Sequence, residues 1–136
     1  MHSRLHVVAG VIHNRCRDLV LVARRLPGSH LAGLWEFPGG KLHPGEDPLC
    51  GLIRELLEEI NIEVTVARPL ILIDHDYQEK SITLDVWSVE EWTGDYEGRE
   101  GQELKWLAVD SLDPREFPAA DRQVIAMLRK PILSQG

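Results

Sequence analysis

The sequence predicts a mixed domain of the α/β or α+β class, in which helices and sheet form a sandwich. Three observations lead to this prediction. An amphipathic helix is expected near the middle of the chain, strand-like segments flank it on both sides, and a second helix is expected only near the end. That order of elements is typical of layered α/β and α+β folds. Because the chain has 136 residues, we expect one domain spanning residues 1–136.

The first part of the chain is rich in strand-forming residues. Leu5 to His13 and Leu19 to Arg25 are the two candidate strands, and the turn-prone residues 14–18 separate them. This arrangement predicts a β-hairpin. Leu26 to Leu34 contains proline, serine and two glycines, so we expect a loop there.

The central helix has predictable ends. Asp47 is a good N-cap, Pro48 suits the first helical position, and Asn61 suits a left-handed C-terminal cap. Gly51 inside the helix is unfavourable by about 1 kcal/mol relative to alanine, which indicates close approach to a neighbouring element. Apolar residues at helical spacing form the expected buried stripe: Leu49, Leu52, Ile53, Leu56 and Ile60.

The remaining elements are predicted from alternation and from turn residues. The expected elements are strands at 62–73 (interrupted at Pro69), 81–92 and 104–109, a glycine-rich loop at 93–101, and a helix from Ala119 or Asp121 to Arg129 that ends at Pro131. Edge strands in such a fold permit a dimer without requiring one, so we expect a monomer or a weak homodimer.

Composition excludes several classes of protein. A net charge of −7 argues against polymeric nucleic acid as a partner, although not against a single nucleotide. No apolar stretch approaches the roughly 20 residues that cross a bilayer, and no signal peptide is expected. Cys16 and Cys50 form no motif and are expected to be free thiols. These observations predict a cytoplasmic protein with no membrane partner.

Three carboxylates of the central helix indicate a metal site. Glu55, Glu58 and Glu59 stand at i, i+3 and i+4 beside Arg54, so a helix places them on one face. Each like-charge pair is unfavourable by roughly 0.2–0.5 kcal/mol. Hard cations such as Mg²⁺ take oxygen ligands and usually bind together with substrate phosphates. The pattern therefore predicts a metal-dependent enzyme that acts on a phosphate ester or anhydride, although a solvated acidic helix face is the simpler alternative.

The segment around these glutamates closely resembles a known motif. It reads Gly40, five residues, Glu46, seven residues, and then Arg54-Glu55-Leu56-Leu57-Glu58-Glu59-Ile60-Asn61-Ile62. This resembles the Nudix box, G-x5-E-x7-R-E-U-x-E-E-x-G-U with U aliphatic, and departs from it only at Asn61, where the box has glycine. The resemblance implies the Nudix fold, a mixed β-sheet between α-helices. It also implies hydrolysis of a nucleoside diphosphate linked to another group, with Mg²⁺ or Mn²⁺.

The resemblance extends to the MutT branch of the family through residues 35–41, 99–102 and 117–121. That branch removes pyrophosphate from nucleoside triphosphates, notably oxidised ones such as 8-oxo-dGTP. By position, the resemblance implies that Arg54 orients the glutamates and that Glu46 supports the start of the helix. The implied metal ligands are the Gly39 carbonyl, Glu55, Glu58, Glu59 and Glu100.

The same resemblance implies a set of substrate contacts. Arg25, Phe37, Lys80 and Asp121 match positions that contact the base, and Lys41 is a plausible phosphate contact. Lys80 stands where arginine is usual, and Asp121 stands where MutT has asparagine. An ionised Asp121 only accepts hydrogen bonds, which favours cytosine or a wider range of bases, whereas a protonated one can donate to guanine O6. An N-cap role for Asp121 is a further alternative.

These expectations define a reaction and its rivals. Water would attack the β-phosphorus and release a nucleoside monophosphate and pyrophosphate, with Glu55 favoured over Glu100 as the general base. Hydrolysis of oxidised purine nucleotides is the leading hypothesis, and CTP-type pyrimidine hydrolysis is the second. A non-catalytic nucleotide sensor is the rival from another class of function. Such domains usually lose the glutamates of the box, whereas this chain has all of them. Nucleotide sugars and dinucleoside polyphosphates are rival substrates whose additional motifs are not found.

Overall fold

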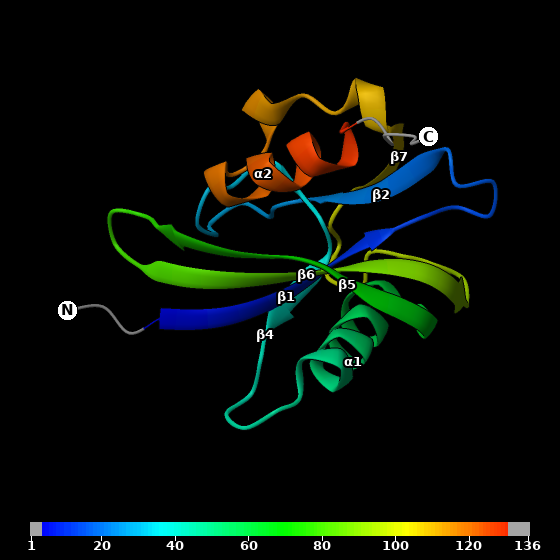
Figure 1. The fold of residues 1–136 in the computed structure, drawn as a ribbon, viewed down its shortest axis with the longest axis horizontal. Coiled ribbons are helices and arrows are strands. Elements are labelled where there is room, and N and C mark those ends of the chain that lie inside the picture. Colours follow the sequence, from blue (N-terminus) through cyan, green and yellow to red (C-terminus); the bar gives the residue numbers. More distant parts are fainter. Residues whose placement is uncertain (1–3, 131–136) are drawn as a thin grey trace, which may run out of the picture.

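A four-stranded mixed sheet lies between the two helices in the computed structural model, which describes residues 4–130 (Figure 1). Helix α1 lies on one side of this sheet. Helix α2, β2 and β7 lie on the other side. The elements in chain order are β1 (Arg4–Ile12), β2 (Leu19–Arg24), β3 (Trp35–Glu36), β4 (Gly39–Lys41), α1 (Pro48–Ile60), β5 (Glu63–Asp76), β6 (Ser81–Thr93), β7 (Leu104–Ala108), two short 3₁₀ helices (Val109–Ser111 and Pro114–Glu116) and α2 (Ala119–Leu128). The predicted α+β sandwich is confirmed.

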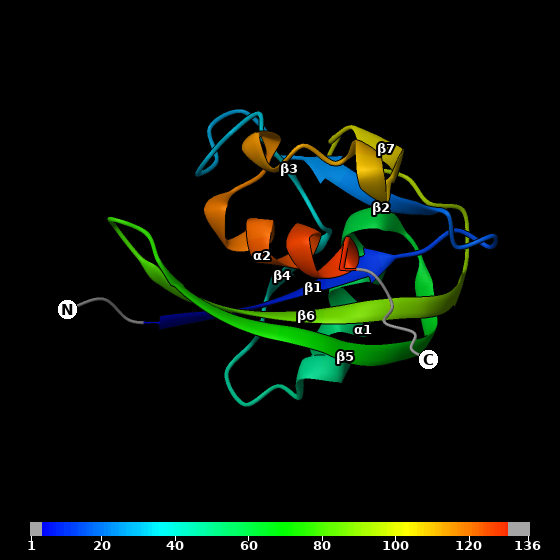
Figure 2. The ribbon, with the colours of Figure 1, turned by 45° about the horizontal axis from the view of Figure 1, so that its top comes forward.

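The strands form two sheets. The larger sheet has the order β4-β1-β6-β5, in which β1 and β6 run parallel and the other pairs run antiparallel. The smaller sheet has the order β3-β2-β7. Figure 2 shows α2 in front of the strands, with the first of the short 3₁₀ segments that precede it beside β2 and β7 and the second near β3.

The predicted hairpin between β1 and β2 is wrong. Strand β1 pairs with β4 and β6, whereas β2 pairs with β3 and β7, so the two strands belong to different sheets. One isolated bridge, His13 with Val20, is all that joins them in β-pairing within the described chain. The turn itself is present, because the Asn14 side chain accepts hydrogen bonds from the backbone N–H groups of Asp18 and Leu19. Local turn signals located the reversal but carried no information about which strands become neighbours.

Helix α1 has the predicted ends and the predicted buried stripe. The Asp47 carboxylate accepts hydrogen bonds from two backbone N–H groups of the first turn, at 3.1 and 3.2 Å. Asn61 has φ 62° and ψ 33°, the left-handed conformation expected for the C-terminal cap. A Cβ added at Gly51 would lie 2.2 Å from Leu42 Cδ2, so the predicted close approach is confirmed. Leu52, Leu56 and Ile60 are fully buried, and Leu49 and Ile53 pack beside them.

One further boundary, the end of β5, differs from the sequence prediction. Strand β5 continues through Pro69 to Asp76. At the proline the strand is not interrupted, but its register with β6 shifts between Pro69 and Ile71. Because β5 is an edge strand of the larger sheet, it can contain a proline, whose missing N–H is not needed for pairing. The predicted helix end at Pro131 lies outside the described residues. Among the helices of residues 4–130, none is long and apolar enough to cross a membrane.

Candidate active site

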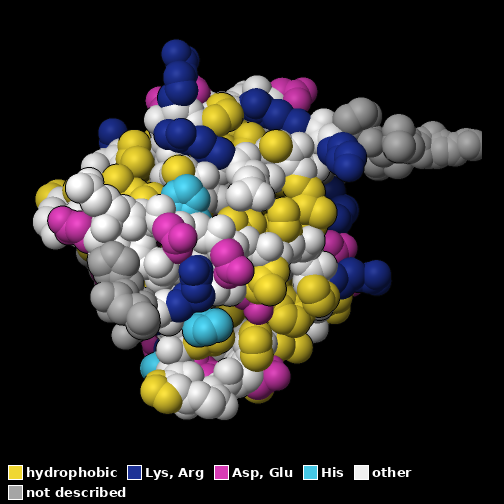
Figure 3. All heavy atoms as spheres, turned by 60° about the vertical axis from the view of Figure 1, so that its left-hand side comes forward, with side chains coloured by type: hydrophobic (Ala, Val, Ile, Leu, Met, Phe, Trp, Pro, Cys, Tyr) yellow, Lys and Arg dark blue, Asp and Glu magenta, His cyan; other side chains and the backbone are white. Residues whose placement is uncertain are grey.

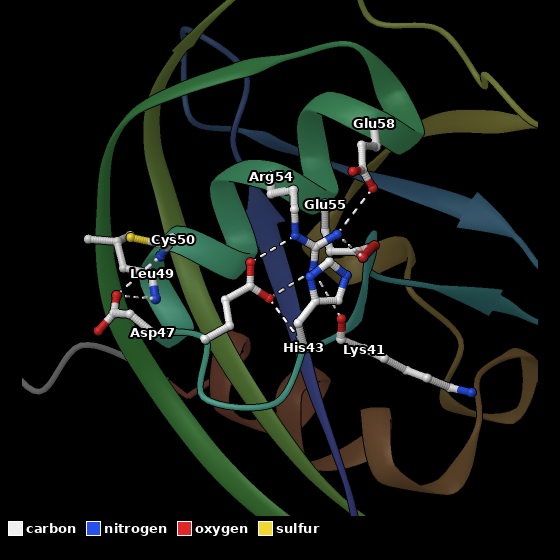
Figure 4. Close-up of polar contacts among 9 residues, drawn as sticks. Lys41, His43, Asp47, Leu49, Cys50, Arg54, Glu55 and Glu58 are labelled. Atoms are coloured by element: carbon white, nitrogen blue, oxygen red, sulfur yellow. Dashed lines mark hydrogen bonds and ion pairs between the residues drawn. The ribbon is translucent and has the colours of Figure 1, made fainter.

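Arg54 is the centre of a hydrogen-bonded network that joins the start of α1 to the preceding loop (Figure 4). Its guanidinium binds both carboxylate oxygens of Glu46, at 2.8 and 2.9 Å, and also binds Glu55 at 2.8 Å and Glu58 at 3.1 Å. It further donates to the Lys41 carbonyl at 3.2 Å. Such a planar, bidentate pair fixes geometry as well as charge. The hydrogen bonds from Arg54 and from the backbone N–H of His43 lower the pKa of Glu46 to about 2.

Glycines of β4 allow the strand to approach α1 closely. A Cβ added at Gly40 would lie 1.9 Å from Glu55 Oε2, and one added at Gly39 would lie 1.9 Å from the Val8 carbonyl oxygen. Neither position can carry a side chain without displacing its neighbour. Glu55 is 9% exposed, and its Oε1 is bound to Arg54 while its Oε2 faces Gly40. The two glycines therefore define where this carboxylate lies.

Glu59 lies in a surplus of negative charge. Its pKa is raised to about 8, first by burial and then by the charges of Glu55, Glu100 and Glu36. Repulsion among carboxylates of this kind is what a divalent cation relieves, and carboxylate oxygens are the donors that Mg²⁺ and Mn²⁺ prefer. The residues present therefore fit the metal that the box implies. Glu58 lies at the rim, with 59% of its side chain exposed and an ion pair to Arg54.

The carboxylates are near one another but are not arranged as a closed metal cage. No three His, Cys, Asp or Glu side chains of residues 4–130 are placed together so as to hold an ion. The raised pKa of Glu59 nevertheless shows that the charges act on it. The two findings agree, because electrostatic repulsion extends over several ångströms whereas Mg²⁺ ligands must lie within about 2.1 Å.

A second polar cluster lies around Arg25 and Asp121. Arg25 Nη1 forms an ion pair with Glu36 Oε1 at 2.5 Å, and Arg25 Nε donates to the His30 carbonyl. Asp121 is only 6% exposed, and its pKa is raised to about 8 by burial and by the Glu36 charge, against the opposing effect of Arg25. Glu36 thus acts on both Glu59 and Asp121, so the two clusters are electrostatically continuous.

Asp121 does not cap α2. The N-cap of α2 is Pro118, which makes no side-chain cap, and Asp121 lies buried within the first turn. The N-cap alternative for Asp121 is therefore wrong. The Ala120 N–H of the same turn donates to the hydroxyl of Tyr77 at 3.1 Å, which ties α2 to the end of β5.

Lys80 lies near enough to Arg25 and Lys41 for their charges to act on it. The pKa of Lys80 is lowered by burial and by the positive charges of Arg25 and Lys41. Lys80 is in the turn between β5 and β6, where its carbonyl accepts from the Tyr77 N–H at 2.8 Å. Figure 3 shows the end of the molecule that carries this turn, where basic, acidic and histidine side chains are interspersed.

The two aromatic residues of the segment before β4 lie in the core. Trp35 is 9% exposed, and the Arg24 guanidinium lies 5.4 Å from its ring centroid. Phe37 is only 3% exposed, and its ring stacks on Phe117 with centroids 5.6 Å apart. The structure therefore leaves Phe37 little open ring surface, so its expected contact with a base stays a prediction.

Cavity size does not locate this site. One hollow of about 1020 Å³ lies beside the turn between β1 and β2, and none of the predicted site residues lines it. A smaller hollow of about 420 Å³ is lined by Lys41, His43 and Glu46 of the box loop together with the start of β1. The carboxylate cluster marks the candidate active site, because it contains the groups that can bind a cation and accept a proton.

Glu36 is the functional candidate that the sequence analysis missed. It lies between two buried aromatic residues in β3, and it alone acts on the pKa of both Glu59 and Asp121 among the residues discussed above. Period-two alternation was the available signal, because Glu36 must face away from Trp35 and Phe37. Its importance depends on its pairing with Arg25, which no local pattern reveals.

A box helix whose carboxylates repel one another, held by an arginine network and lying near a buried polar cluster, is typical of metal-dependent phosphoanhydride hydrolases. The family model described as NUDIX domain matches residues 8–127, and the chain belongs to this family. It is a Nudix pyrophosphohydrolase.

Characterised relatives match almost the whole chain. The 8-oxo-dGTP diphosphatase of Escherichia coli K12 is 35% identical over 94% of this chain and 98% of its own length. The CTP pyrophosphohydrolase of the same organism is 33% identical over 88% of this chain and 86% of its own length. A solved structure from work on MutT of Aliivibrio salmonicida and Vibrio cholerae superposes with a TM-score of 0.82 at 34% identity, covering 93% of this chain and 97% of that one.

Proposed function

We propose that this enzyme hydrolyses nucleoside triphosphates to a nucleoside monophosphate and pyrophosphate, and that oxidised purine nucleotides such as 8-oxo-dGTP are its preferred substrates. The observation that carries the proposal is the buried Asp121, whose pKa is raised to about 8. A carboxyl that keeps its proton at neutral pH can donate a hydrogen bond to guanine O6. The similarity to an 8-oxo-dGTP diphosphatase over nearly the full length of both chains supports the same substrate.

The proposed cofactor is Mg²⁺ or Mn²⁺. The residues that would hold it are the Gly39 carbonyl, Glu55, Glu58, Glu59 and Glu100, as the box resemblance implies. When bound, the cation neutralises the triphosphate and lowers the pKa of water. Arg54 keeps Glu55 and Glu58 oriented through its hydrogen bonds, which also tie both residues to Glu46 in the box loop.

Glu55 is the proposed general base. Its Oε1 is bound to Arg54, which leaves Oε2, beside Gly40, to take the proton from the attacking water. The water oxygen bonds to the β-phosphorus, and the bond from that phosphorus to the α–β bridging oxygen breaks. The bridging oxygen leaves with the nucleoside monophosphate, and the β- and γ-phosphates leave as pyrophosphate. Lys41 is exposed beside the box loop and is the proposed phosphate contact.

The base would lie at the cluster of Arg25, Glu36 and Asp121, with Lys80 at its edge. Arg25 and Glu36 hold each other by their ion pair, so neither side chain needs to be ordered when substrate binds. Phe37 belongs to the proposed contacts only through its edge or backbone, since its ring packs on Phe117.

CTP is the second candidate substrate. The chain is 33% identical to a CTP pyrophosphohydrolase, and an ionised Asp121 would accept a hydrogen bond from the cytosine amine. A purely sensing role is disfavoured because all the box glutamates are present. We further propose that the enzyme acts in the cytoplasm as a monomer or weak homodimer, on small nucleotides rather than on polymeric nucleic acid.

Pyrophosphate release against a substrate panel tests the proposal. The panel is 8-oxo-dGTP, dGTP, 2-hydroxy-dATP, CTP, 5-methyl-dCTP, ADP-ribose and a diadenosine polyphosphate, each with Mg²⁺. We expect the highest kcat/KM for 8-oxo-dGTP. A higher value for CTP or its methylated form would assign the enzyme to pyrimidine nucleotides, and measurable activity only on ADP-ribose or the dinucleotide would refute the proposed reaction.

A further inference from the structure

Asn61 occupies the position at which the chain departs from the Nudix box. Its backbone meets the conformational requirement, because φ is 62° and the N–H caps the Leu57 carbonyl at 3.1 Å. A glycine would meet the same requirement with less strain, since it carries no Cβ. The Asn61 side chain must therefore be explained by what it contacts rather than by the helix end alone.

Both ends of the Asn61 amide bind the loop that follows β6. Its Nδ2 donates to the Asp95 carbonyl at 3.0 Å, and its Oδ1 accepts from Arg99 Nη2 at 2.6 Å. The loop passes so close to this residue that a Cβ added at Gly94 would lie 2.8 Å from the Asn61 carbonyl oxygen. Asn61 thus holds both the beginning and the far part of the loop of residues 94–101.

The same loop satisfies the C-terminal carbonyl groups of α1. The Glu97 N–H donates to the Ile60 carbonyl at 3.0 Å, and the Arg99 N–H donates to the Glu59 carbonyl at 3.0 Å. Helix ends leave such carbonyls without intrahelical partners, and a cation near them is favoured by the helix dipole. Helix α1 has no basic residue in its own last turn, so the Arg99 guanidinium bound to Asn61 supplies the positive charge.

Glu100 follows Arg99 directly, and its backbone is held by Gln102. Its N–H donates to Gln102 Oε1 at 2.9 Å, and Gln102 Nε2 in turn donates to the Glu59 carbonyl at 3.2 Å. The backbone of Glu59 is therefore bonded both to the residue before Glu100 and to the side chain that holds Glu100. The spacing between these two glutamates depends on how firmly the loop is held.

We propose that Asn61 and Arg99 are positioning residues that clasp residues 94–101 to the end of α1 and so set the distance between Glu59 and Glu100. This inference rests on the proposed function in one respect, namely that both glutamates bind the divalent cation. The clasp acts on cation affinity through Glu100 and makes no contact with the nucleotide. It assigns the Asn61 side chain a role that the box glycine cannot perform.

Four single substitutions and two double variants test the clasp, with binding of Mn²⁺ alone measured by electron paramagnetic resonance and loop opening measured by amide hydrogen exchange. Asn61→Gly keeps the left-handed cap but removes both side-chain contacts, and Arg99→Ala removes the partner. We expect each to weaken Mn²⁺ binding roughly tenfold, as for other residues that orient metal ligands. We also expect faster exchange at residues 95–101. Their double variant should be no worse than Asn61→Gly alone, because Asn61→Gly already lacks the side-chain contact that Arg99→Ala removes.

Glu100→Gln provides the decisive background, and Arg15→Ala, which changes an exposed arginine of the turn between β1 and β2, is the matched control. In the Glu100→Gln protein, Asn61→Gly should weaken Mn²⁺ binding no further. Unchanged Mn²⁺ affinity and loop exchange in Asn61→Gly and Arg99→Ala, or an equal loss with and without Glu100, would overturn the inference. If Glu100→Gln alone leaves Mn²⁺ affinity intact while Asn61→Gly still opens the loop, the ligand set of the proposed function has failed, and the cation half of the inference fails with it.

Discussion

The buried Asp121 makes a quantitative prediction about stability. Its pKa rises from 3.8 in the unfolded chain to about 8 in the folded protein, chiefly through burial. The folded protein therefore keeps a proton that the unfolded chain has already lost, and stability must fall as the pH rises between these two values. Each pKa unit corresponds to about 1.4 kcal/mol. Replacing Asp121 by asparagine, which does not ionise, removes this dependence.

The difference between the two proteins isolates the effect of one group. Other titrating groups are shared, so the variant should gain stability relative to the parent by about 3 kcal/mol between roughly pH 5 and pH 7. Urea unfolding at intervals of pH measures it. Asp110→Asn is the control, because Asp110 is an exposed aspartate near the same helix and should leave the pH dependence of the parent unchanged. Parallel curves for Asp121→Asn and the parent would refute the assignment of a protonated, buried carboxyl.

Four further outcomes are expected. Gly40→Ala should lower kcat at least ~10²-fold, because the new Cβ would lie 1.9 Å from Glu55 Oε2 and displace the proposed base; a kcat within a factor of about three of the parent in steady-state assays would contradict this. Arg54→Lys should lower the melting temperature, since lysine cannot bind both Glu46 oxygens, and a calorimetric melting temperature equal to that of the parent would show that the bidentate pair is dispensable. Mg²⁺ should raise the melting temperature in a concentration-dependent way by relieving repulsion around Glu59. An excess of a chelator that removes Mg²⁺ must abolish this increase. The kcat/KM for 8-oxo-dGTP should decline above about pH 8 as Asp121 ionises, and Asp121→Asn should lack that decline.

The central helix was the most predictable element. Its cap residues, its buried stripe and the tight approach at Gly51 are all local consequences of side-chain chemistry, and the structure has each of them. The strand pairing was less predictable. Strands β1 and β2 are adjacent in sequence and joined by a clear turn, but they belong to different sheets. Pairing is decided by which faces must be buried together, and a single sequence does not show that.

The residues of the candidate site also differ in how predictable they were from the sequence. The box residues were found because their spacing on one helix is itself the signal, and Arg54 indeed binds Glu46, Glu55 and Glu58. Glu36 was missed because its significance comes from its ion pair with Arg25. Arg25 lies in the loop after β2 and reaches Glu36 only in the folded chain. The side-chain contacts of Asn61 were missed for a similar reason, because Asp95 and Arg99 lie more than 30 residues away.

The most direct test of the account is the turnover of Glu59→Gln. This change keeps the size of the side chain but leaves a group that cannot ionise when a cation binds beside Glu55 and Glu100. With Mg²⁺ and 8-oxo-dGTP, pyrophosphate release should fall at least ~10²-fold while far-ultraviolet circular dichroism and the melting transition show an intact fold. Near-normal turnover in a folded Glu59→Gln protein would contradict the proposal that these glutamates hold the cation that hydrolysis requires.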